Sequence, residues 1–440
     1  MNEVIDFKKI IIDKFEDFKL NFNGSGTSFL DLIRKDALEN FSSLKFPTPK
    51  DEEWRFTNIS PLLKFNFNPL SEEPEIDLKK IDKLKLKDSF KNRIVFVDGI
   101  FSYGLSELNG LAKTIKIESL TSAIGNNNEL FKLHFNKYAD YSRNIFTALN
   151  TAYGKDGAFI FIPDNKIIEE PVFVLFISTS EHNQSLIQPR NLFIAGKNSQ
   201  ATIVEQYVSL EENIYFTNAI TEIVVGENAN LSHLKIQEES RSAFHISRTE
   251  VNQGRNSSYE SVSISLGAEI SRDEISCRFD AEGGECTLNG LYLIDSSQLH
   301  DTHTMIDHAK PYCNSHEHFK GILDGKSRGV FNGKVMVRPN AQKTNAFQEN
   351  NNIILSSEAL VNTKPQLEIF ADDVKCSHGA TIGQIDDESM FYLKSRGIGE
   401  ETARTILIHA FASDVVKSIK VETVKNYLEE ILDKRFNKES

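Results

Sequence analysis

Residues 196–294 contain four copies of one pattern, a turn followed by an alternating strand: GKNSQATIVEQYV from Gly196, GENANLSHLKIQ from Gly226, GRNSSYESVSIS from Gly254 and GECTLNGLYLI from Gly284. The copies begin 30, 28 and 30 residues apart, and no helical pattern separates them. A steady period built only of turns and strands predicts β-coils that stack on one another as a solenoid. A β-sandwich with coincidental spacing is the alternative that the pattern leaves open.

Short strand-like runs extend this region in both directions. IVFVDGIF, GAFIFI, PVFVLFIS and NLFIA precede it, and RGVFNGKVMVR and NNIILSSEALVNTKPQLEIFA follow it. Val, Ile and Thr dominate these runs, which favours strands. We therefore predict a mainly β core over residues 91–385. A solenoid has no closed core, so both of its ends need covers, and helical segments at the termini could supply them.

Both termini have the apolar spacing of helices. Residues 1–45 lead into a Pro-containing connector that carries the only tryptophan, FPTPKDEEWRFTNISPL (46–62). At the other end, GEETARTILIHAFASDVV and VETVKNYLEEILDKRF each place apolar residues on one face. We predict an N-terminal helical segment and connector at 1–90 and a C-terminal helical docking segment at 386–440.

Composition limits the classes of partner and compartment. The 440 residues include 50 Lys and Arg against 63 Asp and Glu, a net charge of −13, which weighs against nucleic acid as a partner. No run approaches the ~18–20 apolar residues that cross a membrane, and MNEVIDFKKIIIDKF does not resemble a secretory signal. Four cysteines, Cys277, Cys286, Cys313 and Cys376, do not form a disulfide framework. These features predict a soluble, cytoplasmic, reduced protein.

The common catalytic motifs are absent from the sequence. It contains no phosphate-binding loop, no G-x-G-x-x-G, no G-x-S-x-G, no H-E-x-x-H and no paired C-x-x-C. Any ATP hydrolysis must therefore come from another chain. We predict that this chain has no catalytic residues of its own.

The sharpest chemical feature is DDVKCSHGATIG (372–383). In an extended strand, Cys376 and His378 point to one side and Ser377 to the other. A thiolate and an imidazole suit iron, zinc or a cluster, but a tetrahedral site needs four ligands. A buried thiol beside a hydrogen-bonded histidine is the alternative. A thiol–imidazole nucleophile is disfavoured because residues two apart in a strand are separated by roughly 7 Å.

A second group combines five histidines with a cysteine: His300, His303, His308, Cys313, His316 and His318. Its spacing matches no structural metal motif. Residues one coil apart stack in a solenoid, so these side chains could converge or scatter. The sequence leaves their role open.

Three segments resemble one known family. They are PKDEEWRFTNI (49–59), DHAKPYCNSHEHFKGIL (307–323) and residues 327–398, which end in QLEIFADDVKCSHGATIGQIDDESMFYLKSRGI. In this order they closely resemble the SufB/SufD scaffold family of the SUF iron–sulfur cluster assembly machinery, and SufD within it. The resemblance covers nearly the whole chain, although the first 45 residues and residues 65–150 contribute little to it.

The resemblance implies a right-handed parallel β-helix core flanked by N-terminal and C-terminal helical segments. It also implies a non-catalytic scaffold that binds the paralogue SufB and the ATPase SufC. A transient iron–sulfur cluster would be assembled at the SufB–SufD interface and passed to carriers. Whether the chain forms a homodimer when alone stays open. A stand-alone β-helix enzyme such as a polysaccharide lyase is the competing hypothesis, and the lack of a signal sequence and the CSHG motif count against it.

The family's CSHG motif falls on Cys376 and His378. The resemblance implies that His378 is the metal ligand of the shared site and that Cys376 lies next to it. SufB instead has an H-E-A-T version of the motif and a cysteine in the upstream A-Q-x-T segment. This chain has Gly379 after the histidine and Asn350 near the position of that cysteine. Both departures favour SufD over SufB.

Overall fold

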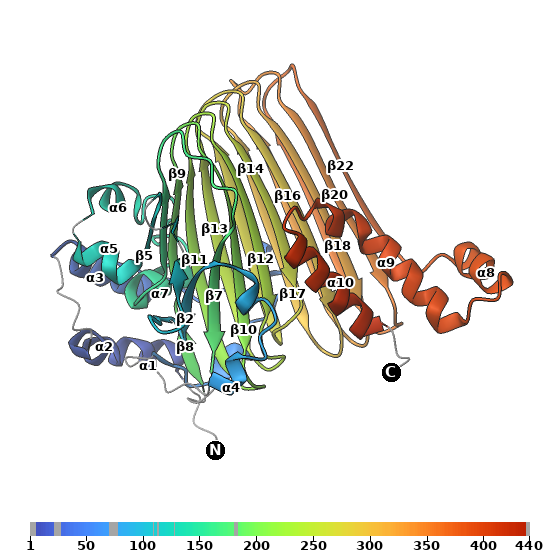
Figure 1. Ribbon diagram of the computed structural model, residues 1–440, viewed down its shortest axis with the longest axis horizontal. Coiled ribbons are helices and arrows are strands. Elements are labelled where there is room, and N and C mark those ends of the chain that lie inside the picture. The colour runs from blue at the N-terminus through green and yellow to red at the C-terminus, as the bar shows by residue number, and fades with distance from the viewer. Residues whose placement is uncertain are drawn as a thin grey trace.

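The computed structural model describes residues 6–21, 28–69, 78–108, 110–111, 114–126, 128–179 and 184–436. The predicted segments 1–90 and 386–440 each extend into residues outside these ranges. The centre of the molecule is a β-solenoid of about eight turns with helices on its flanks (Figure 1). Successive strands alternate between two sheets, so each turn contributes one strand to each sheet.

We call the two sheets odd and even after the numbers of their strands from β9 onward, where odd and even strands separate. The odd sheet runs through β5 (Lys116–Ser119), β6 (Ala158–Ile162), β9 (Arg190–Ala195), β11 (Tyr215–Val225), β13 (Phe244–Gln253), β15 (Ile270–Phe279), β17 (Leu299–His308), β19 (Arg328–Val337) and β21 (Leu360–Ile369), with β1 (Asn68–Pro69) and β8 (Ser185–Ile187) beside it. The even sheet runs through β3 (Ile100–Phe101), β2 (Asn92–Val97), β7 (Val172–Ser178), β10 (Gln200–Ser209), β12 (Asn230–Glu238), β14 (Ser258–Ser265), β16 (Glu285–Ile294), β18 (Asn314–Leu323), β20 (Asn345–Ile354) and β22 (Lys375–Gly383), with β4 (Glu107–Leu108) beside β2.

The coil-to-coil register follows the period of the sequence. Strands β10, β12 and β14 pair in parallel, with Gln200 opposite Asn230 and Asn230 opposite Ser258. The turns before these strands contain Asn198, Asn228 and Asn256, each with a positive φ between 51° and 54°. Asparagine tolerates this left-handed conformation better than most residues. The Asn228 side chain also donates to Asn198 Oδ1 at 2.9 Å. The stacked-coil prediction is confirmed, and the β-sandwich alternative is wrong.

Helices cover the outer face of each sheet. The N-terminal helices α1 (Phe7–Asp13), α2 (Phe15–Asn21) and α3 (Ser28–Ser43) join the fully buried α7 (Ile145–Tyr153) over the odd sheet. Short helices α5 (Leu120–Gly125) and α6 (Glu129–His134) pack near the first coils, and the one-turn helix α4 (Leu78–Ile81) lies beside the even sheet. At the other terminus are α8 (Asp387–Ser395), α9 (Glu400–Ser418) and α10 (Glu422–Phe436).

In the described ranges, no helix has the length and apolar character to span a membrane.

The C-terminal helices do not cover the end of the solenoid, contrary to the expectation from the sequence. Buried side chains of α9 and α10, such as Ile408 and Leu428, pack against outward-facing side chains of the even sheet, such as Val204, Ile236 and Leu293. Strands β21 and β22 of the last coil are mostly exposed or half-buried. The apolar stripe of these helices therefore meets the side of the solenoid, and the last coil is left open (Figure 1).

Candidate functional site

The predicted pair lies on β22, in the last coil. Cys376 is in register with Ala346, and His378 with Gln348. Both partners on β20 are buried, whereas Phe347, which is in register with Ser377, is 41% exposed. Side chains in register on neighbouring parallel strands point to the same face of a sheet. Cys376 and His378 therefore share the inward-facing side of the coil, as the alternation in the sequence predicted.

The two side chains have different surroundings. Cys376 packs against a small apolar cluster that includes Val335 and Ala346, and this burial raises the pKa of its thiol. His378 is exposed, because no further coil covers β22 in the described chain. The thiol is thus shielded, and the imidazole is accessible from the end of the solenoid.

A column of polar side chains runs from His378 into the preceding coils, away from the open end of the solenoid. Gln348 is in register with His378, and Glu317 is in register with Gln348. Glu317 Oε2 accepts hydrogen bonds from Gln348 Nε2 at 2.8 Å and from Thr304 Oγ1 at 2.8 Å. Burial raises the pKa of the Glu317 carboxyl to about 7. Oε1 of Glu317 and Oε1 of Gln348 are buried and have no hydrogen-bond partner among the described residues.

Sequence reasoning missed Gln348 and Glu317. Neither belongs to a recognisable motif, and polar residues in a strand ordinarily indicate its solvent-facing side. The repeat period is the signal that could have found them. Gln348 precedes His378 by 30 residues, and Glu317 precedes Gln348 by 31, which is one coil in each case.

Asn350 occupies the next inward-facing position along β20. Its side chain is fully buried, donates to the carbonyl of Phe319 at 3.3 Å and accepts from Asn352 Nδ2 at 2.7 Å. Tyr292 in turn donates its hydroxyl proton to Asn352. Asn350 is therefore part of an internal hydrogen-bond chain and offers no thiolate.

The histidine-rich group does not come together. His300 and His308 are buried on β17 beside Ser271 and Ser315, and burial lowers the pKa of each imidazole to about 4. The remaining members are spread over both sheets and their turns: His303, Cys313, His316 and His318.

His303 lies on the outer side of β17 instead, 3.0 Å from Asp301. Burial is the largest single effect and lowers the pKa of this imidazole, but the charge of Asp301 and the hydrogen bonds to Asp301 and Glu53 together raise it overall. Nowhere in the described chain do three or more His, Cys, Asp or Glu side chains form a group that could hold a metal ion.

The edges of the last coil carry unpaired backbone groups. In a parallel ladder, the N–H and C=O of one residue point to the same neighbouring strand, and those of the next residue point the other way. Lys375 donates its N–H to Thr344 on the β20 side. The backbone groups of Cys376, His378 and Ala380 therefore point to the free side, where no described strand pairs with β22.

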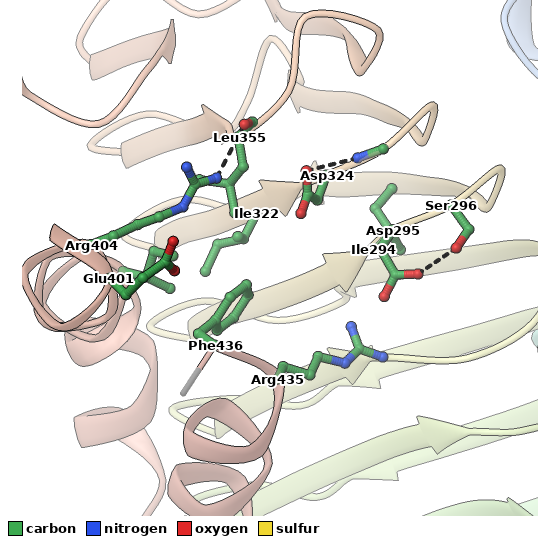
Figure 2. A pocket seen from close by; sticks show the side chains of 12 residues that line it. Ile294, Asp295, Ser296, Ile322, Asp324, Leu355, Glu401, Arg404, Arg435 and Phe436 are labelled. Carbon is green, nitrogen blue, oxygen red and sulfur yellow. Dashed lines mark hydrogen bonds between the residues drawn. The ribbon is translucent and has the colours of Figure 1, made fainter. Parts of the chain in front are cut away.

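A hollow of about 470 Å³ lies where the C-terminal helices meet the solenoid turns (Figure 2). Arg404 of α9 reaches across it and donates to the carbonyl of Leu355 at 3.1 Å. Arg435 of α10 donates to the carbonyls of Leu293 and Leu266 at 2.6 and 2.7 Å. These hydrogen bonds attach α9 and α10 to the solenoid. We therefore assign the hollow to the packing of these helices and not to a binding site.

Helix α8 differs from α9 and α10 because it buries none of its side chains. Phe391 is 74% exposed and Tyr392 is 58% exposed. Together with Ile406 of α9 they line an open hollow of about 860 Å³. Figure 1 shows α8 projecting away from the solenoid. The helix thus presents aromatic surface that nothing in the described chain covers.

Comparison with known proteins gives a consistent assignment along most of the chain. The family described as SUF system FeS cluster assembly, SufBD core domain, matches residues 176–411, and the SufBD protein N-terminal region matches residues 6–174. A SufBD family iron–sulfur cluster assembly protein of Synechocystis sp. is 34% identical over 94% of this chain and 92% of its own. The iron–sulfur cluster assembly protein SufD of Escherichia coli is 32% identical over 86% of each chain, and that of Bacillus subtilis is 26% identical over 93% of this chain and 94% of its own.

Proposed function

We propose, because this chain belongs to the SufBD family of the SUF system for iron–sulfur cluster assembly, that it is a SufD-type scaffold subunit. In this role it holds part of a nascent cluster, which is its cargo, and catalyses no reaction itself. Its four cysteines are free thiols, which fits a reducing compartment such as the cytoplasm. Family membership also leaves the stand-alone lyase without support.

The observation that carries the proposal is the position of Cys376 and His378 in a coil that no described strand covers. Two side chains on one inward face supply at most two ligands, and a cluster iron takes four. The free edges of β21 and β22 offer backbone groups for pairing with another chain. We infer that the paralogue SufB pairs with this end and completes the site.

Asn350 supports a shared site over a self-sufficient one. The resemblance implies that SufB carries a cysteine near this position, and an amide can neither bind iron as a thiolate nor carry a persulfide. Because Asn350 is held in an internal hydrogen-bond chain, its role in this subunit is to pack the interior. Iron is therefore held by His378 together with groups from the partner.

The ATPase SufC is the second partner that we propose. This chain contains no phosphate-binding loop, so nucleotide chemistry must be supplied by another subunit. The exposed aromatic side chains of α8 and the adjoining hollow are suited to a protein partner, since exposed apolar patches commonly mark interaction sites. We assign the docking surface to α8 and the start of α9.

The test is His378→Ala in the purified complex after anaerobic reconstitution. Iron and acid-labile sulfide per complex should fall strongly, because a methyl group cannot bind iron. The melting temperature should stay unchanged, because truncating an exposed strand residue costs little stability. Ser377→Ala, on the outward face, is the matched control. Cys376→Ala separates two roles of the thiol: a loss as large as that of His378→Ala marks a ligand, and a smaller loss marks a neighbour. Normal cluster content in His378→Ala would contradict the proposal.

A further inference from the structure

The inward-facing column beneath His378 contains an acceptor without a donor. Gln348 is fully buried, yet its side-chain oxygen has no hydrogen-bond partner among the described residues. A buried carbonyl left unpaired costs on the order of 1–3 kcal/mol, so such groups usually have a partner. None of the described side chains donates to this oxygen as placed, so its donor is a group that can turn or move onto the column.

Glu317 fixes which way the Gln348 amide points. Above its raised pKa of about 7, the Glu317 carboxyl is ionised and only accepts hydrogen bonds, so it selects the NH₂ end of the amide. Gln348 Nε2 donates to Glu317 at 2.8 Å, which directs the amide oxygen away from Glu317. On the facing strand, Gly333 leaves room for this arrangement, because a Cβ there would lie 2.3 Å from Gln348 Nε2.

His378 is the side chain that stands over Gln348 on the open side. The two residues are in register, and their neighbours in the column, Cys376 and Ala380, stand over Ala346 and Asn350 instead. A neutral imidazole carries one N–H donor and one bare nitrogen. In the structure the exposed ring of His378 makes no hydrogen bond to Gln348. We propose that Gln348 is a positioning residue for His378, accepting the hydrogen bond of one ring N–H when the ring turns onto the column, with Glu317 holding the Gln348 amide in the required orientation.

This arrangement would prepare the His378 ring to bind iron. In this respect the inference rests on the proposed function. The nitrogen that donates to Gln348 keeps its proton, so the other nitrogen keeps its lone pair and is directed toward the open end. Histidines that bind metals commonly donate their second ring N–H in this way, which fixes the tautomer and the ring orientation. The column thus orients His378 before any partner or iron arrives.

The test is the tautomer of His378 in the full chain without metal. We would record the ¹⁵N chemical shifts of the ring nitrogens in histidine-labelled protein at a pH where the ring is neutral, and His378→Ala would identify the signal. The wild type should show one protonated and one bare nitrogen. Gln348→Leu should show the averaged shifts of two exchanging tautomers. Gln366→Leu is the matched control, because this glutamine of β21 also has an unpartnered oxygen in the described chain but lies in register with Lys334, outside the column.

A second variant tests the inference if Gln348→Leu does not fold. Glu317→Leu combined with Gln348→Leu removes the acceptor and its donor together, which is usually better tolerated than removing one partner. It should give the same averaged shifts. In the assembled complex, Gln348→Leu should weaken ferrous iron binding by about tenfold or more.

The inference and the proposed function can fail separately. A His378 tautomer that is averaged in the wild type, or unchanged in both variants, would overturn the inference. Normal iron content in His378→Ala would instead overturn the ligand role, whatever the tautomer.

Discussion

Glu317 lies inside the solenoid with no exposed surface, and burial raises the pKa of its carboxyl from 4.5 to about 7. The folded chain therefore holds this proton more tightly than the unfolded chain does. Between pH 4.5 and 7 the folded state binds more protons, so the contribution of Glu317 to the free energy of unfolding falls as pH rises. Above pH 7 the contribution is constant.

We expect Glu317→Gln to remove this pH dependence. Relative to the wild type, the free energy of unfolding of the variant should rise by roughly 3 kcal/mol between pH 4.5 and 7, because an amide has no charge to desolvate. Urea unfolding at a series of pH values measures the difference. Glu349→Gln is the control, because Glu349 lies beside His318 and its side chain is less buried than that of Glu317. A difference between wild type and Glu317→Gln that does not vary with pH would show that Glu317 is not titrating in this window.

Individual site residues were predictable only as far as local spacing reaches. Alternation along one strand was enough to put Cys376 and His378 on the same face. Gln348 depends on the pairing of β20 with β22, which is set by turn lengths between the strands. His303 was grouped with five residues near it in sequence, yet its contacts are Asp301 on its own strand and Glu53 of the connector. Contacts between distant segments do not follow from local spacing.

The final strands are edges, and the sequence of β21 reflects this. Leu360 and Phe370 donate their N–H groups to carbonyls on the β19 side, so the odd-numbered residues of β21 face the free side. Pro365, which has no N–H, is one of these residues. Proline is tolerated in a strand where its nitrogen faces away from the ladder. The same alternation tells us which other positions can accept proline without loss of a hydrogen bond within the chain.

We expect Ile369→Pro to weaken the complex with SufB while changing the melting temperature little, because the Ile369 N–H faces the free edge. Glu368→Pro is the matched control. It removes an N–H that points to β19, so it should lower the melting temperature. Thermal unfolding of the free chain and the dissociation constant of the heterodimer give the two readouts. Equal loss of stability in both variants would mean that position 369 belongs to the internal ladder.

Helix α8 gives a prediction about the ATPase. Phe391→Ser combined with Tyr392→Ser should reduce binding of SufC at least tenfold and leave the melting temperature unchanged, because α8 buries no side chain. Ile408→Ala, on the buried face of α9, is the contrasting variant and should cost about 2–5 kcal/mol of stability. Affinity measured by calorimetry checks the first effect. Unaltered SufC binding by the double variant would move the docking surface elsewhere.

The C-terminal helices were predictable as helices, but their packing was not. An amphipathic pattern identifies an apolar stripe and does not identify the surface that it meets. The outer face of the even sheet is also apolar, so α9 and α10 cover it. Deleting residues 386–440 would therefore expose that face as well as remove α8. Substitutions confined to α8 separate docking from folding.

At the scale of the whole molecule, helices flank both sheets and one end is left open (Figure 1). The solenoid could be predicted because each coil repeats the same turn and strand at nearly constant spacing. The helices α5, α6 and α7 were not predicted, because they lie between short strands and have no repeat to reveal them. The open end follows from the position of the last coil and could not be recognised before the helices were placed.

The central claim is that His378 binds iron of a cluster shared across this open end. The most direct measurement is pulsed electron paramagnetic resonance of the reconstituted, reduced complex in which only this chain carries ¹⁵N-labelled histidine. A hyperfine coupling from one ¹⁵N nucleus to the cluster is predicted, and it should vanish in His378→Ala. A cluster that forms in the wild-type complex without any ¹⁵N coupling, or with a coupling that persists in His378→Ala, would contradict the account.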